Sequence, residues 1–76
     1  MTNLEKMNEL VGSEANKEQI IKWAYMNRIL FDCVHLETEF EEMEKSVKVF
    51  MDTNSYSESD TEFDLWDKFL DAEFAR

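Results

Sequence analysis

Apolar residues recur along this chain with the 3.6-residue period of α-helices rather than the two-residue period of strands. A short apolar stripe in residues 3–11 is followed by a broad apolar face in residues 17–34 and a third stripe in residues 39–52. The last stretch, residues 59–74, again places apolar residues three or four apart. They are Phe63, Trp66, Leu70 and Phe74. This pattern predicts an all-α fold, a small bundle of three main helices plus a short N-terminal helix.

Three of the predicted helices start with a capping box, in which side chains three residues apart bond to free backbone N–H groups. The pairs are Thr2 with Glu5, Asn16 with Gln19, and Thr38 with Glu41. Gly12, the only glycine, follows the first stripe, where a left-handed C-cap favours a residue without Cβ. Residues 29–36 also suit a strand, so a helix and an extended segment both remain open there.

The length of 76 residues predicts a single domain, residues 1–76. Its composition, 43% hydrophobic and 13% aromatic, supplies enough large side chains for a core without disulfides. The aromatic residues expected in that core are Trp23, Phe31, Phe40, Phe50, Phe63, Trp66 and Phe69. Leu30 belongs to the same broad face as Phe31. Tyr25, Met26 and Tyr56 lie off the stripes and are candidates for an exposed contact surface, with ordinary surface placement as the alternative.

Charge is distributed unevenly along the chain. Residues 1–36 hold five acids and four bases, net −1, whereas residues 37–76 hold thirteen acids and four bases, net −9. The total of −10 argues against direct binding to nucleic acid or an anionic membrane, because phosphates would be repelled. It favours a partner with a basic surface, or high solubility alone.

One set of carboxylates is spaced along a single face of the last predicted helix. Asp60, Asp64, Asp67 and Asp71 follow at i, i+4, i+7 and i+11 with no basic residue between them in that row, which we call the acid row. Glu37, Glu41 and Glu44 would add a second row from the preceding helix. We predict that these residues, with Tyr56, contact a partner. The alternative is a solvated helix face that only keeps the protein soluble.

The sequence argues against a metal site, a cofactor or an enzyme. Asp52, Asn54 and Tyr56 begin like a calcium loop, but Ser57 replaces the glycine at position 6 and Phe63 the glutamate at position 12. Cys33 and His35 are two ligands where a closed zinc site needs four. No phosphate-binding loop or nucleophile elbow occurs.

The expected location is the cytoplasm. Cys33 is the only cysteine, so it cannot form an intramolecular disulfide, and a lone thiol fits a reducing compartment. No stretch has the eighteen or more apolar residues of a membrane span. Glu5 and Glu9 interrupt the place where the apolar part of a signal peptide would be.

Three segments carry a resemblance that covers most of the chain. The MTNLEKMNEL start, the NKEQIIKWAYMNR helix and the closing DLWDKFLDAEF segment resemble small acidic helical proteins of bacteriophages and mobile elements of Gram-positive bacteria. That resemblance implies an accessory role. Anti-defence proteins are common in the class, among them anti-CRISPR inhibitors that look like DNA to a nuclease. It carries over no site residues, because no motif defines them.

The sequence therefore predicts a non-enzymatic, protein-binding inhibitor, encoded by a phage or mobile element. Its acidic C-terminal half would block a basic, nucleic-acid-binding surface of a host protein, for example a nuclease of a defence system. The alternative is a small structural or regulatory adaptor, or a homodimer, that contacts its partner through exposed apolar residues.

Overall fold

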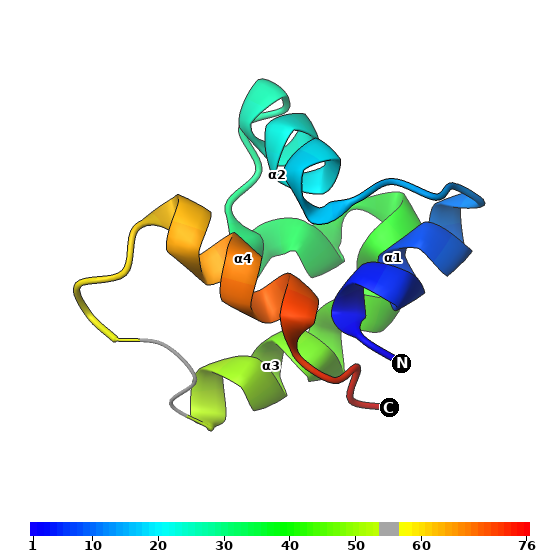
Figure 1. Ribbon diagram of the computed structural model, residues 1–76. Helices are drawn as coiled ribbons and strands as arrows, with labels where there is room; N and C mark the ends of the chain where they lie inside the picture. The colour runs from blue at the N-terminus through cyan, green and yellow to red at the C-terminus, as the bar shows by residue number, and fades with distance from the viewer. Residues whose placement is uncertain (54–56) are drawn as a thin grey trace.

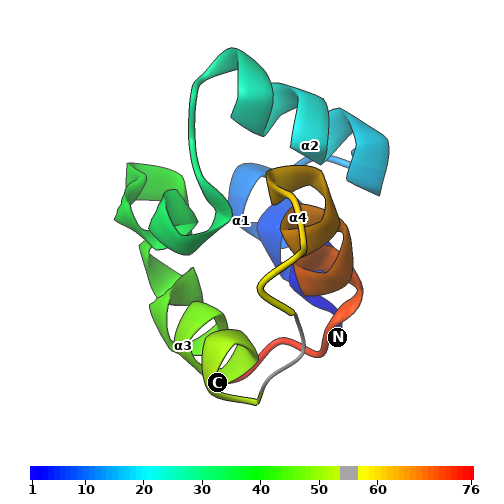
Figure 2. The same cartoon turned by 90° about the vertical axis from the view of Figure 1, so that its left-hand side faces the viewer.

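The computed structural model describes residues 1–53 and 57–76, and these form helices and connecting segments without a strand. The elements are α1 (Asn3–Val11), α2 (Lys17–Met26), the 3₁₀ helices η1 (Phe31–Leu36) and η2 (Thr38–Met43), α3 (Glu44–Asp52) and α4 (Glu62–Asp71). The helices α2 and α3 lie at opposite ends of the molecule, with α1 and α4 between them (Figures 1 and 2). The all-α prediction is confirmed. No helix in the described part of the chain has the length and apolar character needed to cross a membrane.

Local hydrogen bonds start α1 and α2 where the sequence predicts. The Thr2 hydroxyl accepts from the Glu5 N–H while the Glu5 carboxylate accepts from the Thr2 N–H. Asn16 and Gln19 form the same reciprocal pair at the start of α2. Gly12 ends α1 in the left-handed conformation, with a φ of 66°, which a residue without Cβ adopts at little cost.

The prediction of one helix over residues 17–34 is wrong, because α2 ends at Met26. Arg28 takes the left-handed conformation, with a φ of 56°. The Arg28 N–H donates to the Tyr25 carbonyl at 3.2 Å, and the Ile29 N–H donates to the Ala24 carbonyl at 2.9 Å. These two bonds form a Schellman motif, the usual glycine-dependent helix stop. Here arginine occupies the glycine position, so the sequence carries no signal for it.

Residues 29–36 form neither a continuous α-helix nor a continuous extended segment. Leu30 is extended, and a 3₁₀ helix then runs from Phe31 to Leu36. The Phe31 N–H donates to the Glu62 carboxylate at 3.1 Å, which ties the start of η1 to α4. Phe31 is buried as predicted, but Leu30 is 52% exposed and lies outside the core.

The predicted helix over residues 39–52 is an α-helix only from Glu44 onward. Its first part is the 3₁₀ helix η2, in which Phe40 departs from helical geometry. Residues three apart lie on one side of a 3₁₀ helix, so Phe40 and Met43 both face the core and are buried. No side-chain cap precedes η2, and the predicted capping box at Thr38 is therefore wrong.

The last helix is shorter than predicted. A capping box that the sequence analysis missed, Thr61 with Asp64, starts α4 at Glu62, and the helix ends at Asp71. Trp66 is buried with Phe69 and Leu70, as expected. Phe63, in the first turn of α4, is 49% exposed instead of buried.

Aromatic side chains from three elements form the centre of the core. The rings of Phe31, Phe50 and Phe69 lie in mutual contact, with centroids 5.4–5.8 Å apart. The edge-to-face geometry of two of these pairs is a favoured arrangement. Trp66 packs edge-on against Phe69 at 6.4 Å. The core therefore joins η1, α3 and α4.

A buried polar contact fastens the two ends of the chain. Asn3 is fully buried, and its amide donates to the Phe69 carbonyl at 2.8 Å. The Ser46 hydroxyl donates to the Asn3 side-chain oxygen and accepts from the Ala75 N–H. The residues after α4 run beside the N-terminus (Figure 1), where the Asn3 N–H donates to the Ala72 carbonyl at 2.8 Å. The tail is thereby held against α1 and α3.

Candidate protein-binding surface

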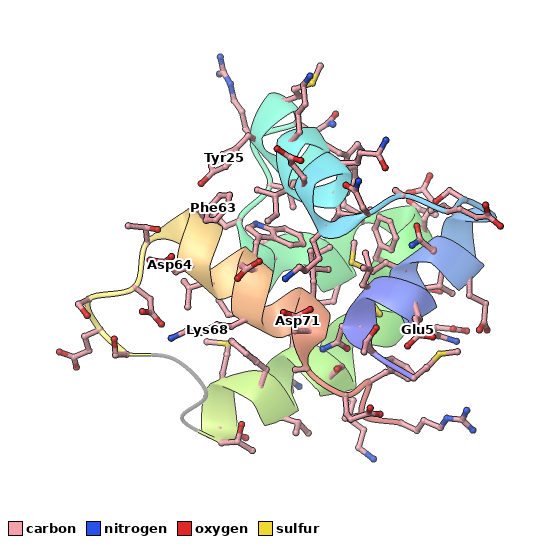
Figure 3. All side chains as sticks on the ribbon, in the orientation of Figure 1. Glu5, Tyr25, Phe63, Asp64, Lys68 and Asp71 are labelled. Carbon is pink, nitrogen blue, oxygen red and sulfur yellow. The ribbon has the colours of Figure 1, made fainter. Side chains whose placement is uncertain are left out.

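The acid row is not a continuous face of one helix. Asp60 lies before α4, and its carboxylate accepts from Lys68 at 2.8 Å and from the Ser57 N–H at 2.9 Å. Asp64 completes the capping box of Thr61. In Figure 3 the Lys68 side chain points from α4 toward the segment that carries Asp60. Two of the four carboxylates therefore serve the structure of the helix start.

The other two members of the acid row share one lysine from α2. Lys17 lies 2.9 Å from Asp67 and 2.7 Å from Asp71. The hydrogen bonds that Lys17 donates to Asp71, and secondly to Asp67, raise the pKa of Lys17 above its ordinary value. The row therefore contains cations, contrary to what its sequence spacing indicates. Lys17 and Asp71 are 54 positions apart in the sequence, so no local pattern reveals this pairing.

Asp60 gives the protein an acid-sensitive element. The hydrogen bond from Lys68, and secondly that from the Ser57 N–H, hold the pKa of Asp60 below its ordinary value of 3.8. A carboxyl with a lowered pKa stabilises the fold fully above its ordinary value and loses that effect as the pH falls through the lowered value. We expect Asp60→Asn to remove part of the acid sensitivity of unfolding.

The measurement is the free energy of unfolding by denaturant at several pH values between about pH 7 and pH 2. The stability difference between parent and Asp60→Asn should shrink as the pH falls toward the lower end. Asp52→Asn is the control, because Asp52 is exposed and forms no ion pair with the described residues. Equal acid sensitivity in parent and Asp60→Asn would contradict the structural role of this carboxylate.

Three carboxylates on and beside η2 form no ion pair with a lysine or arginine within the described chain, whereas a fourth one nearby does. Glu44 pairs with Lys48 at 3.3 Å. By contrast, Glu37, Glu39 and Glu41 form no ion pair within the described chain, and we call these three the η2 acid cluster. Glu39 and Glu41 are exposed and Glu37 is partly so. Glu39 is not among the residues that the sequence predicts to contact a partner.

An apolar groove adjoins this cluster. It lies where the end of α1, the first half of α2 and η2 meet, and it has a volume of about 580 Å³. Its lining residues are Leu10, Val11, Ser13, Ala15, Gln19, Ile20, Trp23, Glu39 and Phe40. Trp23 and Phe40 pack edge-to-face with ring centroids 5.3 Å apart. Glu39 belongs both to the groove lining and to the η2 acid cluster, so the two features share one carboxylate.

Exposed apolar side chains also occur at the end of α2, just after it, and in the first turn of α4. Tyr25, Met26 and Leu30 are 54%, 74% and 52% exposed, and Phe63 is 49% exposed. We call these four residues the apolar patch. Figure 3 shows Tyr25 of α2 pointing toward Phe63 of α4. The expectation that Tyr25 and Met26 are exposed is confirmed, and Phe63 joins them although the sequence placed it in the core.

The remaining chemistry-bearing residues are Cys33 and His35. Burial, followed by a hydrogen bond with Asp32, raises the pKa of the Cys33 thiol, which disfavours the reactive thiolate. The Nδ1 atom of His35 is buried and has no hydrogen-bond partner among the described residues. Within residues 1–53 and 57–76, no three His, Cys, Asp or Glu side chains are arranged to hold a metal ion. Tyr56 lies outside the described residues, as does Asn54 of the calcium-loop pattern.

Comparisons of the chain with protein-family models, with curated proteins and with solved structures give no match.

Proposed function

We propose that this chain is a non-enzymatic, protein-binding inhibitor whose acidic surface covers a basic, nucleic-acid-binding surface of another protein. The resemblance to phage and mobile-element proteins supports a host defence protein, such as a nuclease, as the target in the host cytoplasm. Lys and Arg side chains that bind phosphates are attracted equally to a surface of carboxylates. An inhibitor of this kind needs no active site.

The observation that carries the proposal is the η2 acid cluster. Its three carboxylates, from Glu37, Glu39 and Glu41, lie within five consecutive residues and have no cation within the described chain. A carboxylate that already has an internal cation gains less from a new one, because the existing pair must share or lose its contact. We therefore place the principal contact on η2. The acid row, with Asp67 and Asp71 neutralised in part by Lys17, contributes at the margin.

The test compares two variants with the same change of charge. Glu39→Gln with Glu41→Gln removes two carboxylates from the cluster, whereas Asp52→Asn with Glu58→Gln removes two exposed carboxylates elsewhere. Parent and variants are immobilised, incubated with bacterial lysate across a range of salt concentrations, and eluted with duplex DNA. Proteins released by DNA are those held through a nucleic-acid-binding surface.

We expect the cluster variant to bind such proteins about two- to thirtyfold more weakly, from two exposed ion pairs at about 0.2–1 kcal/mol each. The control variant should bind like the parent. Binding should also weaken steeply with salt, because screening acts over about 8–10 Å near physiological ionic strength. Unchanged capture by the cluster variant, with no effect of salt, would overturn the proposal.

A second candidate function rests on the apolar patch. Tyr25, Met26, Leu30 and Phe63 supply side chains of the kinds enriched at interface centres, and they fit an adaptor or a homodimer. The same salt series separates the two candidates, because apolar contacts persist when charges are screened. Self-association should even strengthen with salt, since two copies each carry a net charge of −10.

A further inference from the structure

We propose that the groove between α1, α2 and η2 receives an apolar side chain from a basic segment of the partner protein. The inference rests on the proposed function and adds what the partner must present there, an aromatic or large aliphatic residue flanked by Lys or Arg. The volume of about 580 Å³ falls within the range of about 300–1,000 Å³ that is typical of ligand pockets.

The floor of the groove is apolar and fixed. Trp23 is partly exposed although it lies in the middle of α2, and its ring is held by the edge-to-face contact with Phe40. Phe40 is itself buried at 3% exposure. Leu10 and Val11 complete the apolar side at the end of α1, and Val11 is 42% exposed. An apolar side chain placed here would remove from water part of the surface that Trp23, Leu10 and Val11 still expose.

The connecting segment that supplies Ser13 and Ala15 to the groove is also preorganised. Asn8 holds the segment that connects α1 with α2. Its amide donates to the Ala15 carbonyl at 2.7 Å, and its oxygen accepts from the Ala15 N–H at 3.1 Å and from the Ser13 hydroxyl at 2.7 Å. Because these hydrogen bonds already hold the segment, little conformational entropy is lost when a ligand binds beside it. The groove therefore exists before a ligand arrives.

Charge selects the occupant. Glu39 lines the groove and has no cation as a partner within the described chain. Glu14 and Glu18 are exposed on the two segments that supply Ser13, Ala15 and Gln19 to the lining. Lys22 is on α2 but is not among the lining residues. Acidic peptides, nucleic acid and a second copy of this chain, with its net charge of −10, would be repelled.

The probe is a short synthetic peptide with one central phenylalanine between lysines. Two comparison peptides replace the phenylalanine by serine or the lysines by glutamates. Each is titrated into ¹⁵N-labelled protein while amide and indole N–H resonances are followed. We expect the first peptide to shift the Trp23 indole and the amides of Leu10, Ala15 and Gln19, and the comparison peptides to bind at least about fivefold more weakly.

A matched pair of variants tests the location. Val11 lines the groove and is 42% exposed, whereas Val49 lies on α3 outside it and is 40% exposed. Val11→Lys should weaken the first peptide by about fivefold or more, because it places a cation against a basic ligand. Val49→Lys should leave the affinity unchanged. Both sites are on the surface, so neither variant should unfold the protein.

The outcomes separate this inference from the proposed function. If the serine peptide binds as well as the phenylalanine peptide, or Val11→Lys has no effect, the groove takes no apolar anchor, while charge-led inhibition still stands. If the glutamate peptide binds equally well, the charge argument for the occupant is overturned. Shifts confined to Tyr25 and Phe63 would show that the peptide binds at the apolar patch and would contradict its binding in the groove. Loss of DNA-released capture by Glu41→Gln alone tests the proposed function independently, because Glu41 belongs to the η2 acid cluster but, unlike Glu39, does not line the groove.

Discussion

Trp66→Ala should destabilise the protein by about 3–5 kcal/mol, the usual cost of truncating a large buried aromatic residue. Trp66 is 1% exposed, and its ring packs edge-on against Phe69. The cavity would open at the junction of α4 with the aromatic centre of the core, and the well-ordered rings around it have little room to collapse. Domains are typically stable by only about 5–15 kcal/mol, so the variant should lose a large part of the stability of the fold and unfold at a clearly lower denaturant concentration.

The matched control for Trp66→Ala is Phe63→Ala on the same helix. Phe63 is 49% exposed, and its truncation should cost less than about 1 kcal/mol because about half of its surface already meets water. Denaturant unfolding, followed by circular dichroism, measures both. Equal stability losses in the two variants would contradict the burial of Trp66 relative to Phe63.

Asn3→Ala should cost about 2–3 kcal/mol, more than its small loss of volume accounts for. The substitution leaves the buried Ser46 hydroxyl without its acceptor and removes the amide that bonds to the Phe69 carbonyl. A buried polar group without a partner costs about 1–3 kcal/mol. The Phe69 carbonyl keeps the Ala72 N–H as a second donor, so the larger part of the loss comes from Ser46.

A double-mutant cycle isolates this contact. Asn3→Ala and Ser46→Ala should together cost less than the sum of the single variants, because removing both partners leaves no hydroxyl donor unsatisfied. Asn27→Ala is the surface control. Its amide also donates to a carbonyl, that of Trp23, but the site is exposed and water can replace the bond. Additive losses at Asn3 and Ser46 would show that the two side chains act independently.

The candidate surface was only partly predictable. Residues 37–76 do carry the acidic excess that the sequence indicates, and Glu37 and Glu41 are among the carboxylates without an internal cation. The acid row was selected for its spacing, yet Lys17 and Lys68 reach it from α2 and from within α4. The groove had no signal at all, because its lining comes from three elements that meet only in the folded chain.

The sequence alone determined those features whose hydrogen bonds or periodicity are local. The capping boxes at Thr2 and Asn16 and the left-handed Gly12 join residues within a few positions of each other, so residue type and spacing suffice to predict them. The helical period likewise identified the all-α class and the burial of Trp66. Such contacts form in almost any context in which the segment is helical.

Only the tertiary structure decided where the middle of the chain leaves the α-helix and which charges meet. Arg28 adopts a conformation that favours glycine, and η2 replaces an α-helical turn so that Phe40 and Met43 both reach the core. In each case burial of large apolar side chains outweighs local preferences of about 1 kcal/mol per residue. The pairing of Lys17 with Asp71, 54 residues away, depends on the packing of α2 against α4. The charge that a surface presents therefore cannot be predicted from the spacing of acids along the sequence, because folding brings distant cations to the carboxylates.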